Sequence, residues 1–339
     1  MKLAVVFFNL GGPDSPGAIE PFLFNLFRDP AILSVPGFLR TPLARLIAHR
    51  RAPIAREIYA KIGGRSPILQ ETQAQARALE RALHQHETRA FVAMRCSEPF
   101  SDDVAREIAA WAPDRIVLLP LYPQFSTTTT GSSMKDWWRA AVAAGLVAPQ
   151  SRICCFPWES GFVAAMAELT RETMAKAHGD VSYRVLFSAH GLPEKIIAKG
   201  DPYRWQIERT AAALADCLEV EDWTVCYQSR VGPLKWIGPS TDAEIRRAGT
   251  DGKGIVVVPI AFVSEHSETL VELDIDYRVL AQGAGVRDYL RVPTVGTHPQ
   301  FIACLAQLVL QSLAQREAVT CEAGRICPAA QRACGFAQG

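Results

Sequence analysis

The sequence predicts an α/β fold in which two similar halves, each a doubly wound parallel sheet, flank a cleft and are followed by a C-terminal extension that contains cysteines. Three observations support this prediction. Apolar runs of strand length recur with almost no polar alternation, which is typical of parallel sheets covered on both faces. A longer helical pattern follows each run. The two halves also share a pattern of glycine and proline.

The predicted elements are bounded by Gly or Pro. The runs that we expect to form strands are Leu3–Phe8, Arg115–Leu121, Arg184–Phe187 and Ile255–Phe262. The segments that we expect to form helices include Thr72–His86 and Trp205–Cys217. Strands rich in Val, Ile and Leu that alternate with helices indicate a doubly wound architecture.

The similarity between the halves has a constant offset. Residues 3–13 align with residues 183–193, so that Gly11 falls on Gly191, Pro13 on Pro193 and Leu10 on His190. Residues 116–121 and 255–260 form a second similar pair. Any two buried strands look alike, but matched Gly and Pro positions fix backbone shape rather than hydrophobicity. We therefore expect Rossmann-like halves at residues 1–175 and 176–315, and a cysteine-containing tail at residues 316–339.

Composition narrows the class of protein. The 339 residues are 49% hydrophobic, which is enough for two domains. A formal net charge of +1 provides no attraction to nucleic acid, so no nucleic-acid partner is expected. No apolar stretch reaches the roughly 18 residues that span a bilayer, and the apolar N-terminal run is too short for a secretion signal. These features predict a cytoplasmic protein.

An acidic segment follows the last predicted strand and begins at Ser264, which we expect to be a helix N-cap. Glu268, Glu272 and Asp276 are spaced i, i+4, i+8, which places them in one row on a helix. Like charges at this spacing repel, and the segment has no Lys or Arg to offset them. One interpretation is a solvated acidic face. The other is a ladder that carries protons or hard cations toward His266 and Glu268.

His190 lies at the end of a predicted buried strand of the second half, where Gly191 and Pro193 leave it little conformational freedom. Such a histidine is often structural when it stands alone. An imidazole is also the natural group to take protons at physiological pH. With the Glu–His pair of the acidic segment across a cleft, His190 is a candidate base or metal ligand.

Two further stretches resemble binding loops. Thr127–Met134, with Arg139 beyond it, could cap a helix that faces an anionic group, or it could be an ordinary N-cap. Gln228–Pro239 presents Trp236, which suits a flat aromatic ligand or a loop anchor. The usual nucleotide-binding fingerprints are absent from the sequence.

Taken together, these residues resemble the ferrochelatase family nearly from end to end. The motifs that carry the resemblance are Asn9–Pro13, Ile62–Ile68, Thr130–Ser133, Phe187–Pro193, Gly200–Tyr203, Gln228–Pro233 and Pro259–Tyr277. Each motif is weak alone, and the combination is specific. The resemblance implies an enzyme that inserts Fe²⁺ into protoporphyrin IX with release of two protons, the last step of haem biosynthesis.

The resemblance also implies roles for individual residues. His190 matches the catalytic histidine and Glu268 its partner carboxylate, and both would contact the substrate Fe²⁺. The polar path behind them, often distorted toward a π-helix in the family, is matched by His266, Glu272 and Asp276. The residues that match the porphyrin pocket are Leu10, Tyr59, Arg139, Trp236 and Phe262. Arg139 would serve a propionate, whereas Leu10 cannot ligate metal and would contribute shape only.

Some relatives hold a [2Fe–2S] cluster through one internal and three C-terminal cysteines. Cys155 matches the internal ligand, and the neighbouring Cys154 is the alternative candidate for this ligand. The tail supplies Cys321, Cys327 and Cys334 in a C-x5-C-x6-C pattern, which suits ligation by four thiolates. The animal pattern is C-x2-C-x4-C, so the choice of ligands is open.

The segments Phe22–Phe27 and Pro30–Leu39 resemble the family's apolar lip. The lip could rest on a membrane surface, which would make the protein membrane-associated, or it could pack against the core. A homodimer is also left open.

The alternative functions are a coproporphyrin ferrochelatase, a chelatase for another metal such as cobalt, and a two-lobed protein that binds haem or metal. The acidic row argues against simple binding, because holding a ring needs no proton path.

Overall fold

The computed structural model describes residues 1–230, 234–315, 319–322 and 324–337. Contacts divide the chain into two compact units. Unit 1 comprises Met1–Cys155, Leu305–Ile326 and Gly335–Gly339, and unit 2 comprises Phe156–Cys304 and Cys327–Cys334. The three-part division expected from the sequence, with boundaries after residues 175 and 315, stays a prediction, as does the cleft between the halves.

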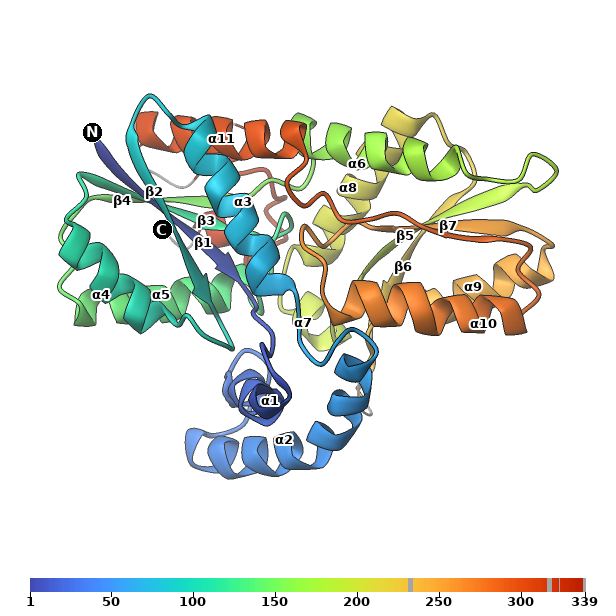
Figure 1. Cartoon of the computed structure of the whole chain (residues 1–339), viewed down its shortest axis with the longest axis horizontal. Coiled ribbons are helices and arrows are strands. Elements are labelled where there is room, and N and C mark those ends of the chain that lie inside the picture. Colours follow the sequence, from blue (N-terminus) through green and yellow to red (C-terminus); the bar gives the residue numbers. More distant parts are fainter. Residues whose placement is uncertain (231–233, 316–318, 323, 338–339) are drawn as a thin grey trace. The chain divides into compact units, whose positions relative to one another are not determined.

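Unit 1 is built on a parallel sheet with the strand order β2-β1-β3-β4-β9 (Figure 1). Its strands are β1 (Lys2–Asn9), β2 (Glu87–Met94), β3 (Arg115–Pro120), β4 (Gln150–Cys155) and β9 (Val319–Thr320). The central strand β1 is buried along nearly its whole length, as expected for a strand covered on both faces.

Unit 2 repeats this topology with the order β6-β5-β7-β8, again all parallel. Its strands are β5 (Tyr183–His190), β6 (Trp223–Gln228), β7 (Gly254–Pro259) and β8 (Tyr289–Arg291). The register agrees with the internal alignment: Ala4 pairs with Ile116 in unit 1, and Arg184 pairs with Ile255 in unit 2. The prediction of two similar doubly wound halves is therefore confirmed at the level of single residue pairs.

Helices cover both faces of each sheet (Figure 1). In unit 1, one face packs against α4 (Ser101–Trp111) and α5 (Thr130–Ala143), and the other carries α3 (Ile68–Ala82) and the C-terminal part of α11 (Pro299–Ala314). The helices on the two faces of the unit 2 sheet are α6 (Ser160–Met174) and α8 (Tyr203–Leu218) on one side, and α9 (Thr241–Thr250), a π-helix (Glu268–Asp276) and α10 (Tyr277–Gly283) on the other.

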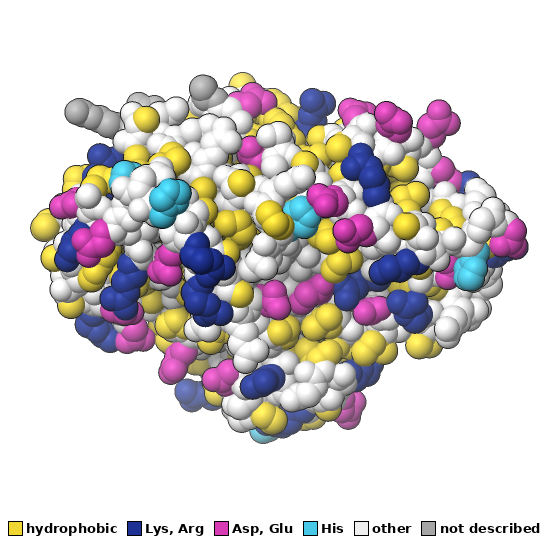
Figure 2. Space-filling view, turned by 45° about the horizontal axis from the view of Figure 1, so that its top comes forward, with side chains coloured by type: hydrophobic (Ala, Val, Ile, Leu, Met, Phe, Trp, Pro, Cys, Tyr) yellow, Lys and Arg dark blue, Asp and Glu magenta, His cyan; other side chains and the backbone are white. Residues whose placement is uncertain are grey.

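The predicted lip forms a helical pair in unit 1. Helix α1 (Ile19–Arg28) packs on α2 (Gly37–Ala60) through a small apolar cluster. On α2, Phe38 and Ile54 are 79% and 61% exposed. No helix in the described ranges is long and apolar enough to cross a membrane. Charged side chains of both signs are interspersed on the face shown in Figure 2, in keeping with a formal net charge of +1.

Several element boundaries differ from the predictions. The helix expected from Ser264 begins instead at Glu268, with Ser267 at the N-cap and no side-chain cap. Ser264 lies four residues before the helix, and its carbonyl oxygen lies 3.0 Å from Nδ1 of the His266 ring. Helix α3 begins at Ile68, four residues before the expected Thr72, and β7 ends at Pro259 rather than Phe262.

Two glycines in unit 2 form a matched pair for testing how α9 and α10 pack. A Cβ on Gly249 would lie 2.0 Å from the carbonyl oxygen of Ala284, whereas a Cβ on Gly283 would meet nothing within 4 Å. Gly249→Ala should lower the free energy of unfolding by about 1–3 kcal/mol, because backbone must move. Gly283→Ala should raise it by about 0.5–1 kcal/mol, because alanine is the better helix former. Urea denaturation of both variants tests this, and equal stability of the two would contradict it.

Candidate active site

The site in unit 2 lies where a doubly wound sheet ordinarily binds ligands. His190 is the last residue of β5, and β7, its neighbour in the sheet, leads into the π-helix that carries Glu268. The connections from β5 and β7 go to opposite faces of the sheet, so the carboxyl ends of these strands form the topological switch point.

Glu268 lies between two imidazoles. Its Oε1 is 3.6 Å from Nε2 of His190, and its Oε2 is 3.7 Å from Nε2 of His266. The three side chains are 27%, 35% and 13% exposed, respectively, so the group is half-buried and still open to solvent or substrate. The structure thus brings together three of the predicted site residues.

Both histidine rings are oriented by a backbone carbonyl. Nδ1 of His190 lies 2.6 Å from the carbonyl oxygen of Gly191, and Nδ1 of His266 lies 3.0 Å from that of Ser264. A carbonyl only accepts hydrogen bonds, so each Nδ1 must carry the proton. In a neutral ring this leaves the Nε2 lone pair free on the side of Glu268, which is the arrangement that a proton acceptor needs.

Electrostatics favour an ionised Glu268 and a protonated His266. Burial alone would raise the pKa of Glu268, but the charges of His190 and His266 and a hydrogen bond with His266 lower it to about 2. Burial alone would lower the pKa of His266, but the hydrogen bond and charge of Glu268 raise it above its usual value. The carboxylate therefore stays charged at neutral pH and stabilises the protonated form of His266.

Glu272, one turn further along the π-helix, has the opposite tendency. Burial and the charge of Glu268 raise its pKa, and hydrogen bonds from Ser229 and Tyr277 only partly offset them. Ser229 donates its N–H at 2.9 Å and also its hydroxyl, and Tyr277 donates its hydroxyl at 3.0 Å. Ser229 adopts a left-handed φ of +60°, which aims both of its donors at one carboxylate. Asp276, the third member of the row, is exposed.

Tyr203 contacts the backbone of His190, although the sequence did not predict it as a site residue. The hydroxyl of Tyr203 donates to the main-chain carbonyl of His190 at 3.1 Å, and Asp201 Oδ1 accepts the N–H of Tyr203 at 3.0 Å. Its signal in the sequence is the Gly200–Tyr203 motif, one of those that carry the family resemblance. Phe262, a predicted pocket residue, packs edge-on against the ring of His266 with centroids 4.6 Å apart.

The remaining predicted pocket residues lie in both units. Leu10 is half-buried at the end of β1, and Tyr59 is buried at the end of α2. Arg139 on α5 makes a two-fold ion pair with Asp102 at 2.8 and 2.7 Å, so a propionate would have to compete for this guanidinium. In unit 2, Trp236 is half-buried and its Nε1 has no partner among the described residues. Residues 231–233 of the Gln228–Pro239 loop lie outside the described residues.

The cysteines are distributed over both units. In unit 1, β4 ends in the buried Cys154 and Cys155, and Cys155 pairs with Thr320 of β9, so Cys321 follows directly. In unit 2, Cys327 is 5% exposed and its Sγ accepts a bond from Gln206 Nε2 at 3.1 Å. The described ranges contain no group of three or more His, Cys, Asp or Glu that could hold a metal ion.

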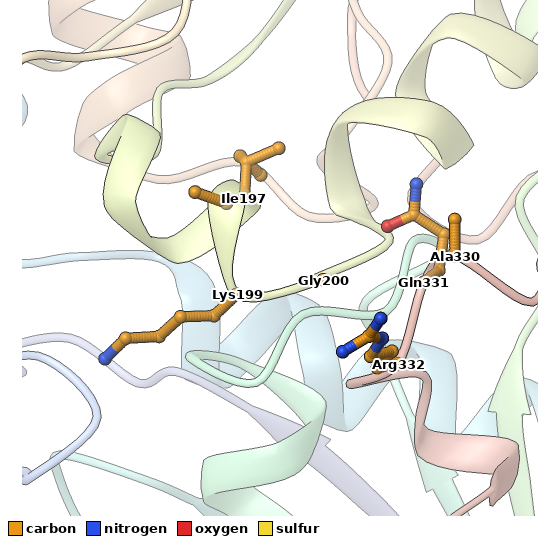
Figure 3. A pocket seen from close by; sticks show the side chains of 7 residues that line it. Ile197, Lys199, Gly200, Ala330, Gln331 and Arg332 are labelled. Atoms are coloured by element: carbon orange, nitrogen blue, oxygen red, sulfur yellow. The ribbon is translucent and has the colours of Figure 1, made fainter.

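A separate pocket of about 540 Å³ lies within unit 2 (Figure 3). It is lined by two segments, residues 197–200 and 330–332, with Lys199 and Arg332 on its walls. None of the predicted site residues lines it.

Solved structures with a similar fold define the class. The chain is similar to SirB from Bacillus subtilis with Fe³⁺, with a TM-score of 0.55 and 14% identity over 93% of this chain and 96% of that one. It is also similar to the multi-domain protein DR2241 from Deinococcus radiodurans, described as structurally similar to chelatases, with a TM-score of 0.50 and 14% identity over 94% of this chain and 56% of that one. The fold is therefore that of the metal chelatases.

Sequence similarity makes the assignment specific. The family model Ferrochelatase matches residues 2–313. Curated ferrochelatases are 57% identical over 92% of this chain and 90% of the relative in Caulobacter vibrioides (strain NA1000 / CB15N), and 55% identical over 100% of this chain and 99% of the relative in Phenylobacterium zucineum (strain HLK1). The chain belongs to the ferrochelatase family. It is an enzyme of haem biosynthesis that inserts ferrous iron into a porphyrin, as the resemblance predicted.

The coupling between Glu268 and His266 can be measured directly. In Glu268→Gln, the pKa of His266 should fall, because burial lowers it and the opposing carboxylate is gone. The titration of the His266 ring by NMR tests this. Asp276→Asn is the control, since it removes an exposed carboxylate from the far end of the π-helix and should leave the His266 midpoint unchanged. An unchanged midpoint in Glu268→Gln would show that the carboxylate does not stabilise the imidazolium.

Proposed function

We propose that His190 is the base that removes the pyrrole protons and that Glu268 is its partner. The observation that carries the proposal is the position of Glu268 between the Nε2 atoms of two oriented histidines. When Fe²⁺ enters the porphyrin, two N–H bonds break and the metal binds all four pyrrole nitrogens, so two protons must leave. An imidazole with a free Nε2 accepts a proton, and the facing carboxylate stabilises the resulting imidazolium.

Glu272 and Asp276 continue the path for protons away from this pair. Because its pKa is raised, Glu272 can take up a proton more readily than an ordinary glutamate. Asp276 is exposed and can pass a proton to solvent. Glu268 keeps its charge and is suited to contact the incoming Fe²⁺, because carboxylate oxygen and imidazole nitrogen are both ligands for this ion.

The aromatic and apolar residues would hold the macrocycle. Phe262 and Trp236 offer ring surfaces in unit 2, while Leu10, Tyr59 and Arg139 belong to unit 1. A planar porphyrin hides its nitrogens, so a pocket that bends the ring would expose a lone pair to the metal. Leu10 contributes shape alone, because its side chain has no ligand atom.

We infer that protoporphyrin IX is the porphyrin, by analogy with relatives that carry a cysteine tail. Coproporphyrin is the alternative, so both porphyrins are to be assayed side by side. If Fe²⁺ is inserted faster into coproporphyrin than into protoporphyrin IX, this choice of substrate is wrong, but the roles proposed for His190 and Glu268 are unaffected.

We also propose that Cys155, Cys321, Cys327 and Cys334 hold a [2Fe–2S] cluster. The donors fit in type, because all four are thiols that can ligate as thiolates, and strand pairing sets Cys321 next to Cys155. The bond from Gln206 to Cys327 is of the kind that stabilises a ligating sulfur. Such a cluster would supply a redox-active iron centre and would tie the tail to β4.

The protein is proposed to work in the cytoplasm, with its lip against a membrane surface where porphyrin partitions. The support is the exposure of Phe38 and Ile54 on α2, together with the arginines of the same helix.

His190→Ala should lower kcat for Fe²⁺ insertion by about 10²–10⁴-fold, because general base catalysis is lost. Porphyrin affinity, measured by fluorescence quenching, should stay within a few-fold of wild type. The control is His178→Ala, which removes an exposed histidine and should keep full activity. Wild-type kcat in His190→Ala would end the proposed role.

Serine substitutions of Cys154 and Cys155 test which of these neighbouring cysteines ligates the proposed cluster. Anaerobically purified wild-type protein should show the visible absorbance of a [2Fe–2S] centre, Cys155→Ser should lose it, and Cys154→Ser should keep it. The reversed result would assign the ligand to Cys154. Wild-type protein without this absorbance, and without iron or sulfide by chemical analysis, would refute the cluster.

A further inference from the structure

Gln228 is the last residue of β6 and lies beside His190 in the sheet. The two residues are register partners, and the main-chain carbonyl of Gln228 accepts the N–H of Gly191 at 2.9 Å. The Gln228 residue is only 1% exposed. Its backbone is thus fixed to the strand that carries the proposed base.

The side chain of Gln228 extends from this strand to the π-helix. Its Nε2 donates to the main-chain carbonyl of Glu268 at 3.1 Å and to the carboxylate of Glu272 at 3.2 Å. These two acceptors lie on successive turns of the π-helix. One buried amide therefore connects the strand of His190 to the backbone of its partner carboxylate.

The orientation of this amide is determined by its neighbours. Its Oε1 accepts the hydroxyl of Ser188 at 2.9 Å, and the Ser188 hydroxyl lies 3.1 Å from that of Thr241. Ser188 and Thr241 are both fully buried. A reversed amide would set its oxygen against two acceptors and lose both hydrogen bonds to the π-helix.

We propose that Gln228 is a positioning residue for metal insertion, which holds Glu268 opposite His190 by clamping the π-helix to the end of β6. The inference rests on the proposed roles of His190 and Glu268. The distance of 3.6 Å between their side chains depends on how two separate elements are spaced, and Gln228 bonds to both of these elements. Small displacements of catalytic groups cost large factors in rate.

The test is Gln228→Met, which keeps the length and approximate shape of the side chain and removes its hydrogen bonds. The expected result is a fall in kcat for Fe²⁺ insertion of about 10–100-fold, typical for loss of an orienting contact, with KM for porphyrin unchanged. Hydrogen–deuterium exchange should rise in peptides that cover residues 265–280. It should stay low in peptides that cover β5, because the sheet does not depend on this side chain.

Two variants serve as controls. Ser188→Ala removes the bond that orients the amide and should give a smaller fall in kcat of the same kind. Gln75→Met removes an equally buried amide from α3 in unit 1 and should keep the wild-type kcat.

An unchanged kcat in Gln228→Met would overturn the proposal. So would a lower melting temperature with faster exchange throughout unit 2, since that pattern marks a general structural role. This test is separate from that of the proposed function. Full activity in His190→Ala would refute the role of His190 as the base. The exchange pattern of Gln228→Met would still show whether Gln228 holds the π-helix to β6.

Discussion

The structure of the site depends on one constraint, which is that a half-buried carboxylate must be compensated. Removing Glu268 from water is unfavourable, and the compensation comes from an imidazole on each of its oxygens. Each imidazole in turn is bonded to a backbone carbonyl, so the backbone at the ends of the strands determines the orientation of the rings. The result is an ionised carboxylate between two imidazoles, an arrangement that suits the roles proposed for His190 and Glu268.

The sheet topology explains why these groups meet. A doubly wound sheet leaves a gap where neighbouring strands send their connections to opposite faces, and β5 and β7 form this point in unit 2. His190 comes from one strand and Glu268 from the segment after the other, 78 positions later in the chain. The parallel register brings these distant parts of the sequence to within 3.6 Å, an ion-pair distance.

The sequence predicted the fold well because its signals are local. Unbroken apolar strands and the matched glycines and prolines predicted two similar halves, and the structure shows the same register in both, with Ala4 paired with Ile116 and Arg184 paired with Ile255. The acidic row was visible, but its π-helical form came only from the family resemblance. Ser264 looked like a helix cap, and no local rule shows that its carbonyl is needed by the ring of His266.

The contacts that the sequence could not reveal are long-range. Tyr203 bonding to His190 and Gln228 bonding to Glu268 join residues from different elements, and a buried glutamine or tyrosine looks the same in sequence whatever it bonds. Arg139 was expected to meet a propionate, yet the structure shows its guanidinium already paired with Asp102. In each case the partner is chosen by tertiary packing.

The comparison of the two units explains why the clamp is an amide. Asn9 pairs with Met94 in unit 1 as Ala189 pairs with Tyr227 in unit 2, so the position after Met94 corresponds to Gln228. That position in unit 1 is Arg95, which bonds to Asp29 at 2.9 Å. Burial and the charge of Glu268 raise the pKa of Glu272. An arginine at the same place in unit 2 would put a cation beside Glu272 and lower this pKa again. A neutral amide donates to Glu268 and Glu272 without adding a charge, so glutamine suits the proposed proton path of unit 2 at the position where unit 1 has an arginine.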